Sequence, residues 1–172
     1  MIKSEKKVKD LSLLLSGENS ILIVEGIGLL RHEEPFEGAI GLLAALYDKS
    51  DDSSVRKSIE GFMNDLKDQS VSSEVIKEIR KPFKQETISM LVASCWQSGL
   101  NYSEYSDDLV NIFLGSDYVT ALECLTVIEE SVQELSVSKR NELINFIEEY
   151  PVHPPTEKTG LIQELKTILK QE

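Results

Sequence analysis

The segment TISMLVASCWQ, residues 87–97, decides the fold of this chain. It is uncharged and mostly apolar, although 28% of the residues in the whole chain are charged. Ile88, Leu91, Val92 and Cys95 recur at helical spacing, which indicates one buried face of a helix. Gly99 follows the segment and is typical of a helix end. The sequence therefore predicts a central core helix, with the rest of the chain stacked on either side.

The length and composition predict a single globular domain over residues 1–172. A chain of 172 residues can bury one sizeable core but is short for two domains. Its 41% hydrophobic content is too high for a disordered chain. The longest uncharged run, residues 87–103, contains amide and hydroxyl side chains, so it predicts a core helix and no membrane association.

The formal charge of −12 argues against a nucleic-acid partner, because Lys and Arg dominate phosphate binding. Cys95 and Cys124 are too few for a disulfide framework and are not spaced as a metal pair, which favours small buried side chains. The lysines before LSLLLSG resemble the start of a signal peptide. However, the apolar part is short and no cleavage site follows. We therefore expect a cytoplasmic protein.

Apolar spacing and capping residues predict ten helices and no strand. Asn19 or Ser20 can cap the second helix, Pro35 suits the first position of the third, and Ser72 or Ser73 can cap the fifth. A Pro-rich linker, PVHPP at 151–155, separates the last two helices. The expected helices cover 8–15, 21–31, 35–48, 55–66, 75–79, 87–97, 107–114, 118–134, 138–150 and 157–170.

The helical pattern repeats with a step of 33 residues. On the first helices of successive pairs, this step superposes Leu43, Ile76 and Leu109, and then Leu46, Ile79 and Ile112. On the second helices it superposes Val55, Ile88 and Ala121, then Ile59, Val92 and Leu125, then Phe62, Cys95 and Ile128. Such ladders are typical of arrays in which each helix pair packs against its neighbours.

Residues 19–149 resemble a HEAT-like, armadillo-type helical repeat. The resemblance rests on PFEGAIGLLAALYDKSDDSSVRKSIEGFM (35–63) and GSDYVTALECLTVIEES (115–131). The first has a proline-led helix, an acidic turn and a second helix that opens with Asp52, Val55 and Arg56. The second keeps Asp117 but has Thr120 where an arginine is expected. The 33-residue step is shorter than the about 40–47 residues of most HEAT units. The resemblance implies an all-α, right-handed superhelix of about five antiparallel helix pairs.

In HEAT-like arrays the second helices line the concave surface, so the resemblance implies that three further ladders face a groove. These ladders are Lys57, Met90 and Glu123, then Glu60, Ala93 and Thr126, then Asn64, Gln97 and Glu130. Met90 and Ala93 would place an apolar patch in its middle, beside Trp96. This face is either a partner-binding anchor or additional core. The candidate partner-binding residues are Lys57, Glu60, Asn64, Glu86, Met90, Ala93, Trp96, Gln97, Glu123, Thr126 and Glu130.

The acidic residues are concentrated in one stretch of the chain. Residues 85–138 contain no Lys or Arg but nine Asp or Glu, which amounts to three quarters of the net charge. This stretch would attract a partner with a basic surface, or it is a solvated face that keeps the protein in solution. We expect a basic protein or peptide partner, and a monomer or weak homodimer.

Residues for chemistry are scarce. The only histidines, His32 and His153, lie far apart in the repeat register, and no phosphate-binding, nucleophile-elbow or zinc-protease motif is present. Neither cysteine has a histidine at catalytic spacing. The sequence therefore predicts no enzyme activity, no metal and no cofactor.

The favoured function is a protein-interaction module or scaffold that binds its partner through an acidic concave groove. One alternative is a HEAT-like DNA-repair-type enzyme, which the acidity disfavours because such a groove should be basic. The other is a regulatory or immunity-type protein that neutralises a basic partner.

Overall fold

The computed structural model describes residues 4–151 and 157–171, and this part of the chain is all-helical, with no strand. It contains ten α-helices, the number that the apolar spacing predicted. It also contains three short 3-10 helices. Most of the predicted linker, including His153, lies outside the described residues. No helix in the described ranges combines the length and hydrophobicity that crossing a bilayer requires.

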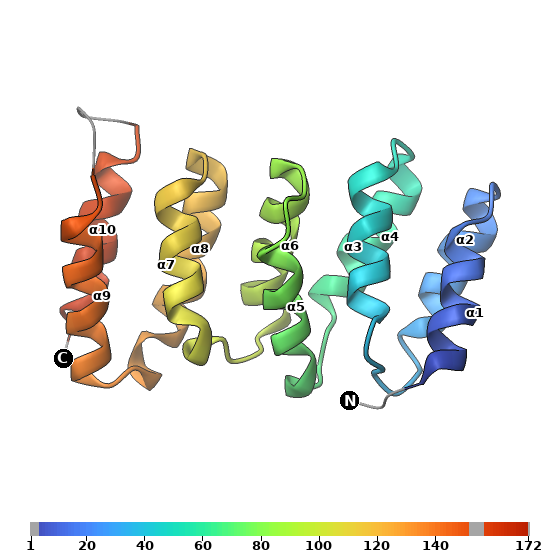
Figure 1. Ribbon diagram of the computed structural model, residues 1–172, viewed down its shortest axis with the longest axis horizontal. Helices are drawn as coiled ribbons and strands as arrows, with labels where there is room; N and C mark the ends of the chain where they lie inside the picture. Colours follow the sequence, from blue (N-terminus) through green and yellow to red (C-terminus); the bar gives the residue numbers. More distant parts are fainter. Residues whose placement is uncertain (1–3, 152–156, 172) are drawn as a thin grey trace. The chain divides into compact units, whose positions relative to one another are not determined.

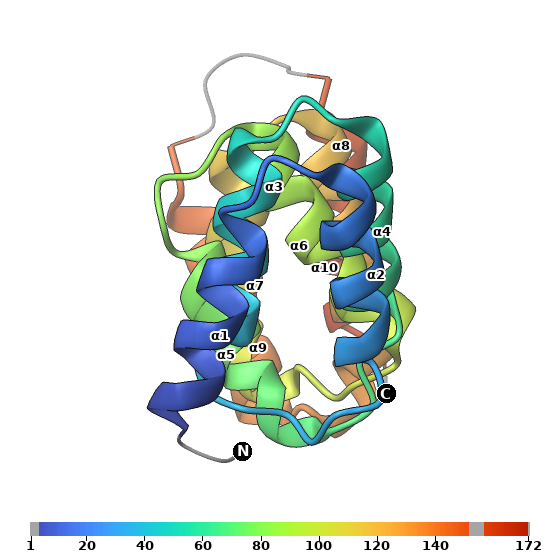
Figure 2. The ribbon, with the colours of Figure 1, turned by 90° about the vertical axis from the view of Figure 1, so that its right-hand side faces the viewer.

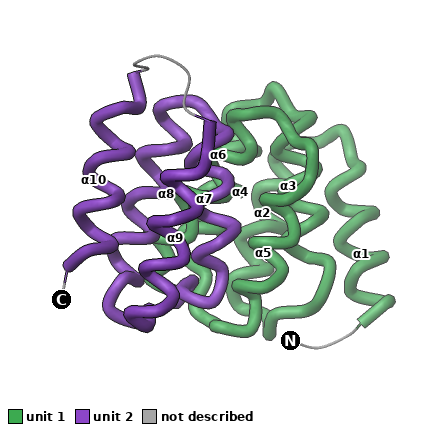
Figure 3. Tube along the Cα trace, turned by 60° about the vertical axis from the view of Figure 1, so that its left-hand side comes forward, with its two compact units in different colours: residues 1–100 green, residues 101–172 purple. Residues whose placement is uncertain are grey.

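The chain divides into two compact units, residues 1–100 and 101–172 (Figure 3). Figure 1 labels the α-helices in chain order. The first unit contains α1 Glu5–Leu15, α2 Ser20–Leu30, α3 Ala39–Lys49, α4 Ser53–Asn64, η1 Gln69–Val71, α5 Ser72–Ile79 and α6 Gln85–Ser98. The second contains η2 Ser103–Tyr105, α7 Ser106–Gly115, α8 Tyr118–Ser131, η3 Val132–Glu134, α9 Val137–Glu149 and α10 Thr159–Leu169. The expectation of one domain stays a prediction.

The helices of the first unit form two layers. In one layer α3 packs against both α1 and α5, and in the other α4 packs against both α2 and α6 (Figure 2). The predicted central segment forms most of α6, where Leu91, Val92 and Cys95 are fully buried. The core lies between the layers because each helix turns its apolar stripe toward the opposite layer.

The second unit is built from two helix pairs. Helix α8 packs against α7 and α10, and α9 packs against α7 and α10. The Lys158 ammonium donates hydrogen bonds to the carbonyl oxygens of Phe113, Leu114 and Ser116, at 2.6–3.1 Å. A cation at the C-terminal end of α7 satisfies carbonyls that the helix itself leaves unpaired.

Polar contacts within each unit join residues about one predicted repeat apart. The Ser20 hydroxyl donates to Asp52, 32 residues away, and the backbone N–H of Gly41 donates to Glu74, 33 residues away. In the second unit, Lys139 donates to Asp107, also 32 residues away. These separations match the 33-residue step inside each unit, while stacking of all the pairs into one superhelix stays a prediction.

The start of the third helix was predicted wrongly. Helix α3 begins at Ala39 and not at Pro35, because Gly38 takes a left-handed conformation (φ 99°) that separates the proline turn from the helix. Gly38 has no side chain with which to cap α3. The Glu74 carboxylate of α5 accepts hydrogen bonds from the N–H groups of Gly38 and Gly41 instead.

Other helix starts divide into confirmed and wrong predictions. Asn19 caps α2, as predicted. Asp52 and Asp117 cap α4 and α8 in the same way, as short polar side chains before a helix commonly do. Neither Ser72 nor Ser73 caps α5, since η1 leads directly into that helix and Val71 is its N-cap residue.

Candidate partner-binding site

A depression of about 380 Å³ lies between α4 and α6. Six of the eleven residues predicted to bind a partner line it, together with three that were not predicted. The predicted residues are Glu60, Asn64, Glu86, Met90, Ala93 and Gln97, and the others are Tyr47, Arg56 and Ser89. The fold of the first unit therefore brings predicted residues together from as far apart as Glu60 and Gln97, which are 37 positions apart in the sequence.

Helical spacing explains this convergence. The side chains of Val55, Ile59 and Phe62 turn into the core, which leaves Arg56, Glu60 and Asn64 on an adjacent stripe of α4. On α6, Glu86, Met90, Ala93 and Gln97 form the corresponding stripe. Because α4 and α6 pack side by side, the two stripes form the two walls of the depression.

The floor of the depression is apolar. Met90 lines it but is only 7% exposed, so its side chain forms the bottom and does not project into solvent. Ala93 is half-buried and Gln97 is exposed. The second face of the central helix is thus exposed at Glu86 and Gln97 and buried at Met90 between them, and a partner can reach Met90 only from within the depression.

Four side chains form a network of charged and polar groups in the depression. The Arg56 guanidinium lies over the Tyr47 ring, 4.3 Å from its centre, and donates to Glu86 Oε2 at 2.8 Å. The Tyr47 hydroxyl, in turn, donates to Glu60 Oε1 at 2.7 Å. The stacked guanidinium gains from the negative face of the ring as well as from its ion pair.

This network also raises the pKa of two of its members. The hydrogen bond to Glu86, followed by the contact with Tyr47, raises the pKa of Arg56. Burial, followed by the hydrogen bond to Glu60, raises the pKa of Tyr47. At neutral pH a cationic Arg56 and a neutral tyrosine therefore stand between two carboxylate side chains, and the cluster keeps an excess of negative charge.

The remaining predicted residues lie elsewhere. Lys57 is exposed on α4 and Trp96 is half-buried on α6, and neither lines the depression. Glu123, Thr126 and Glu130 belong to α8 in the second unit. There they share the helix with three exposed apolar side chains, those of Tyr118, Val119 and Leu122.

Sequence reasoning did not assign Tyr47 or Arg56 to the site. Arg56 carried a signal, because it lies four residues before Glu60 on one helical stripe and was part of the HEAT-like segment. Tyr47 carried none, since it belongs to α3 in the other helical layer and reaches the depression only through the fold.

The chain was compared with protein-family models, curated proteins and solved structures, and none of them matches it. Within the described ranges, no three His, Cys, Asp or Glu side chains gather in an arrangement that could hold a metal ion. The depression between α4 and α6 is therefore the structural feature that bears on the function of the chain.

Proposed function

We propose that this chain is a protein-interaction module, a helical-repeat scaffold that binds a basic segment of a partner protein. The depression between α4 and α6 carries the proposal, because it combines an apolar floor with two carboxylate side chains and two amides in one concave surface. Recognition sites commonly join an apolar anchor with a few oriented polar groups. In this proposal the pairs stack into a right-handed, HEAT-like superhelix whose second helices line the binding face.

A lysine or arginine of the partner would enter between Glu60 and Glu86. Glu86 is the accessible acceptor, since its side chain is 71% exposed and keeps its second carboxylate oxygen for a new donor. The methylene groups of the incoming side chain would lie over Met90 and Ala93. Long basic side chains pack their stems on apolar surface in this way while the charged end keeps a polar partner.

Helix α8 carries a separate candidate binding surface within the second unit. Val119 and Leu122 are 57% and 43% exposed, and Glu123 and Glu130 follow on the same helix. No Lys or Arg occurs between Asp117 and Glu134. A basic segment with apolar side chains would match this combination of exposed hydrophobic and acidic groups.

Selection from a displayed random-peptide library against the immobilised chain tests the proposal. We expect enriched peptides to be rich in Lys and Arg. We expect Glu86→Lys to weaken their binding about twofold to fivefold, the effect of one exposed charge pair. Asp51→Lys makes the same charge change at an exposed position that does not line the depression, and should leave binding unchanged. Enrichment of acidic peptides, or equal effects of the two variants, would contradict the proposal.

A further inference from the structure

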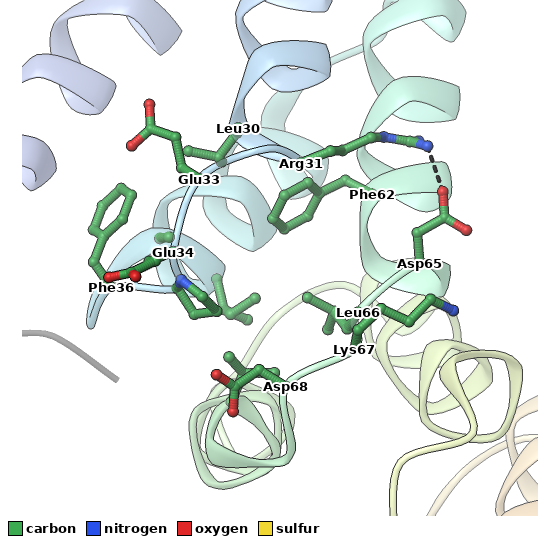
Figure 4. Close-up of a pocket in the computed structure, with 14 residues that line it drawn as sticks. Leu30, Arg31, Glu33, Glu34, Phe36, Phe62, Asp65, Leu66, Lys67 and Asp68 are labelled. Carbon is green, nitrogen blue, oxygen red and sulfur yellow. Dashed lines mark hydrogen bonds and ion pairs between the residues drawn. The ribbon is translucent and has the colours of Figure 1, made fainter.

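A second and smaller pocket, of about 180 Å³, lies in the first unit, and no residue of α6 lines it (Figure 4). It forms where the end of α2, the turn before α3, the end of α4 and η1 meet. Its floor is apolar and each floor side chain is at most 9% exposed. The floor consists of Leu30, Phe36, Ile40, Phe62, Leu66 and Val71.

The rim of this pocket is charged, and its two sides differ in the sign of their charges. In Figure 4 the carboxylates of Glu33, Glu34 and Asp68 lie on one side, and the Lys67 ammonium extends to the other side. On the Lys67 side, Arg31 is paired with Asp65, so its charge is already neutralised. The opposite side therefore presents an acidic edge directly beside an apolar cavity.

Two of the three carboxylates on that edge already have donors. Lys7 of α1 lies 2.8 Å from Glu33, and Asp68 accepts a hydrogen bond from the Ser70 N–H. The hydrogen bond from Ser70 lowers the pKa of Asp68, so this carboxylate stays ionised over a wide pH range. Glu34 is exposed at the tip of the turn and faces solvent beside the opening.

The size of the pocket selects the kind of ligand. Cofactor and small-molecule sites usually enclose about 300–1,000 Å³. A volume of about 180 Å³ suits one side chain better, and a single buried side chain is the usual anchor of a peptide in a pocket. The acidic edge adds a requirement for positive charge next to that anchor.

We infer that this pocket is a docking site for a peptide that inserts one apolar side chain between α2 and α4 and places a Lys or Arg next to Glu34. The site goes beyond the proposed function because it shares no residue with the depression between α4 and α6. A partner protein can use either site without the other.

Titration of the isotope-labelled full chain with capped tripeptides, followed by amide NMR spectra, tests the inference. The probes are Arg-Phe-Arg, Glu-Phe-Glu and Arg-Gly-Arg, each raised to about 5 mM, a range in which a millimolar Kd is visible. We expect Arg-Phe-Arg alone to shift the amides of Phe36, Ala39 and Val71. Failure to shift them, or equal shifts with Glu-Phe-Glu, would overturn the inference. Shifts confined to Ala93 and Gln97 would also overturn it, and would place the peptide in the other depression.

Two variants separate the floor from the rim. Ala39→Leu should abolish the shifts by filling the pocket, provided that circular dichroism shows an unchanged fold. Glu34→Lys leaves the floor intact and should weaken Arg-Phe-Arg binding about twofold to fivefold. Glu104→Lys, an exposed charge reversal in the second unit, is the matched control and should change nothing. If Arg-Phe-Arg bound Glu34→Lys and the unchanged chain with equal affinity, Glu34 would not contact the basic residue, and the inference would be wrong.

Discussion

Glu74 shows how one residue can carry a contact that no local pattern reveals. It lies on α5 with 6% exposure, and its Oε1 accepts hydrogen bonds from the N–H groups of Gly38, at 2.9 Å, and Gly41. Its Oε2 is buried and has no hydrogen-bond partner among the residues that the structure describes. The carboxylate thus caps α3 with one oxygen while the other is desolvated without compensation.

Burial raises the pKa of Glu74, and nearby Glu78 adds to this effect, although the two backbone hydrogen bonds act in the opposite direction. A raised pKa in the folded state means that folding favours the protonated form. The stability that this preference contributes is fully present below the unfolded pKa. It is lost as the pH rises through the folded pKa. Above its folded pKa the ionised Glu74 therefore costs stability.

Glu74→Gln should remove that cost, because the amide oxygen keeps the two backbone hydrogen bonds and the side chain carries no charge. We expect urea unfolding at pH 7 to show a gain of about 1 kcal/mol, and the gain should vanish near pH 4. Glu5→Gln, at an exposed position on α1, is the control. A variant that is less stable than the unchanged chain at pH 7 would show that the charged cap outweighs its desolvation.

The same residue explains a limit of sequence reasoning. In the sequence, Glu74 is one of 30 acidic residues, and nothing marks it as a helix cap. Pro35, in contrast, is a well-placed helix start. The prediction that the third helix starts at Pro35 was wrong because Gly38 takes a left-handed conformation, and a carboxylate 36 residues away accepts the hydrogen bond at the start of the helix. For Met90 the sequence left a partner-binding anchor and additional core as alternatives. The packing of α4 against α6 buries Met90 to 7% exposure, although it still lines the depression. Long-range packing is what local periodicity does not encode.

Helices themselves were predicted well because their signals are local. Apolar spacing located all ten, and α4 contains the predicted buried residues Val55, Ile59, Phe62 and Met63. The candidate site was predicted in part for the same reason. Residues on one stripe of α4 and one stripe of α6 meet, while Tyr47, from the other layer, could be found only in the structure.

Helix α6 depends on α3 for its start. Asp48 Oδ1 accepts hydrogen bonds from the Lys84 N–H and the Thr87 hydroxyl, both at 2.8 Å. Burial acts to raise the pKa of Asp48, but these hydrogen bonds outweigh it and lower the pKa below its ordinary value. A carboxylate from another helix thus accepts the hydrogen bonds at the start of α6 that an N-cap side chain usually accepts.

Asp48→Ala should destabilise the chain by about 1 kcal/mol, the usual effect of losing a cap, and Asp48→Asn should lose less because its amide oxygen can still accept. Urea unfolding at pH 7 measures both values. The cost of Asp48→Ala should shrink as the pH falls, because a lowered folded pKa gives stability that disappears on protonation. Asp51→Ala, at a nearby exposed position, should have little effect. Equal losses for Asp48→Ala and Asp51→Ala would exclude the capping role.

At the scale of the whole molecule, every helix of the first unit packs against at least one other helix of the same unit. Each of its two layers is continuous from the first pair to the third, and both long-range caps lie inside residues 1–100. A chain of 100 residues can bury enough apolar surface to fold alone.

We therefore expect a fragment of residues 1–100 to be helical and to unfold cooperatively in urea, as followed by circular dichroism. A fragment ending at Lys84 removes α6 and with it the buried side chains of Leu91 and Val92, so it should unfold at lower urea or lack a transition. Two fragments with the same transition would contradict the importance of α6 to this unit.

The two caps also limit how this chain can be lengthened. Glu74 of α5 holds the start of α3, and Asp48 of α3 holds the start of α6. An extra helix pair inserted after Leu66 would move Glu74 away from the Gly38 N–H and Asp48 away from the Lys84 N–H. The starts of α3 and α6 would then lose their caps. The same insertion between Leu100 and Asn101 leaves both caps intact. An inserted helix pair is therefore tolerated between Leu100 and Asn101 and costly after Leu66.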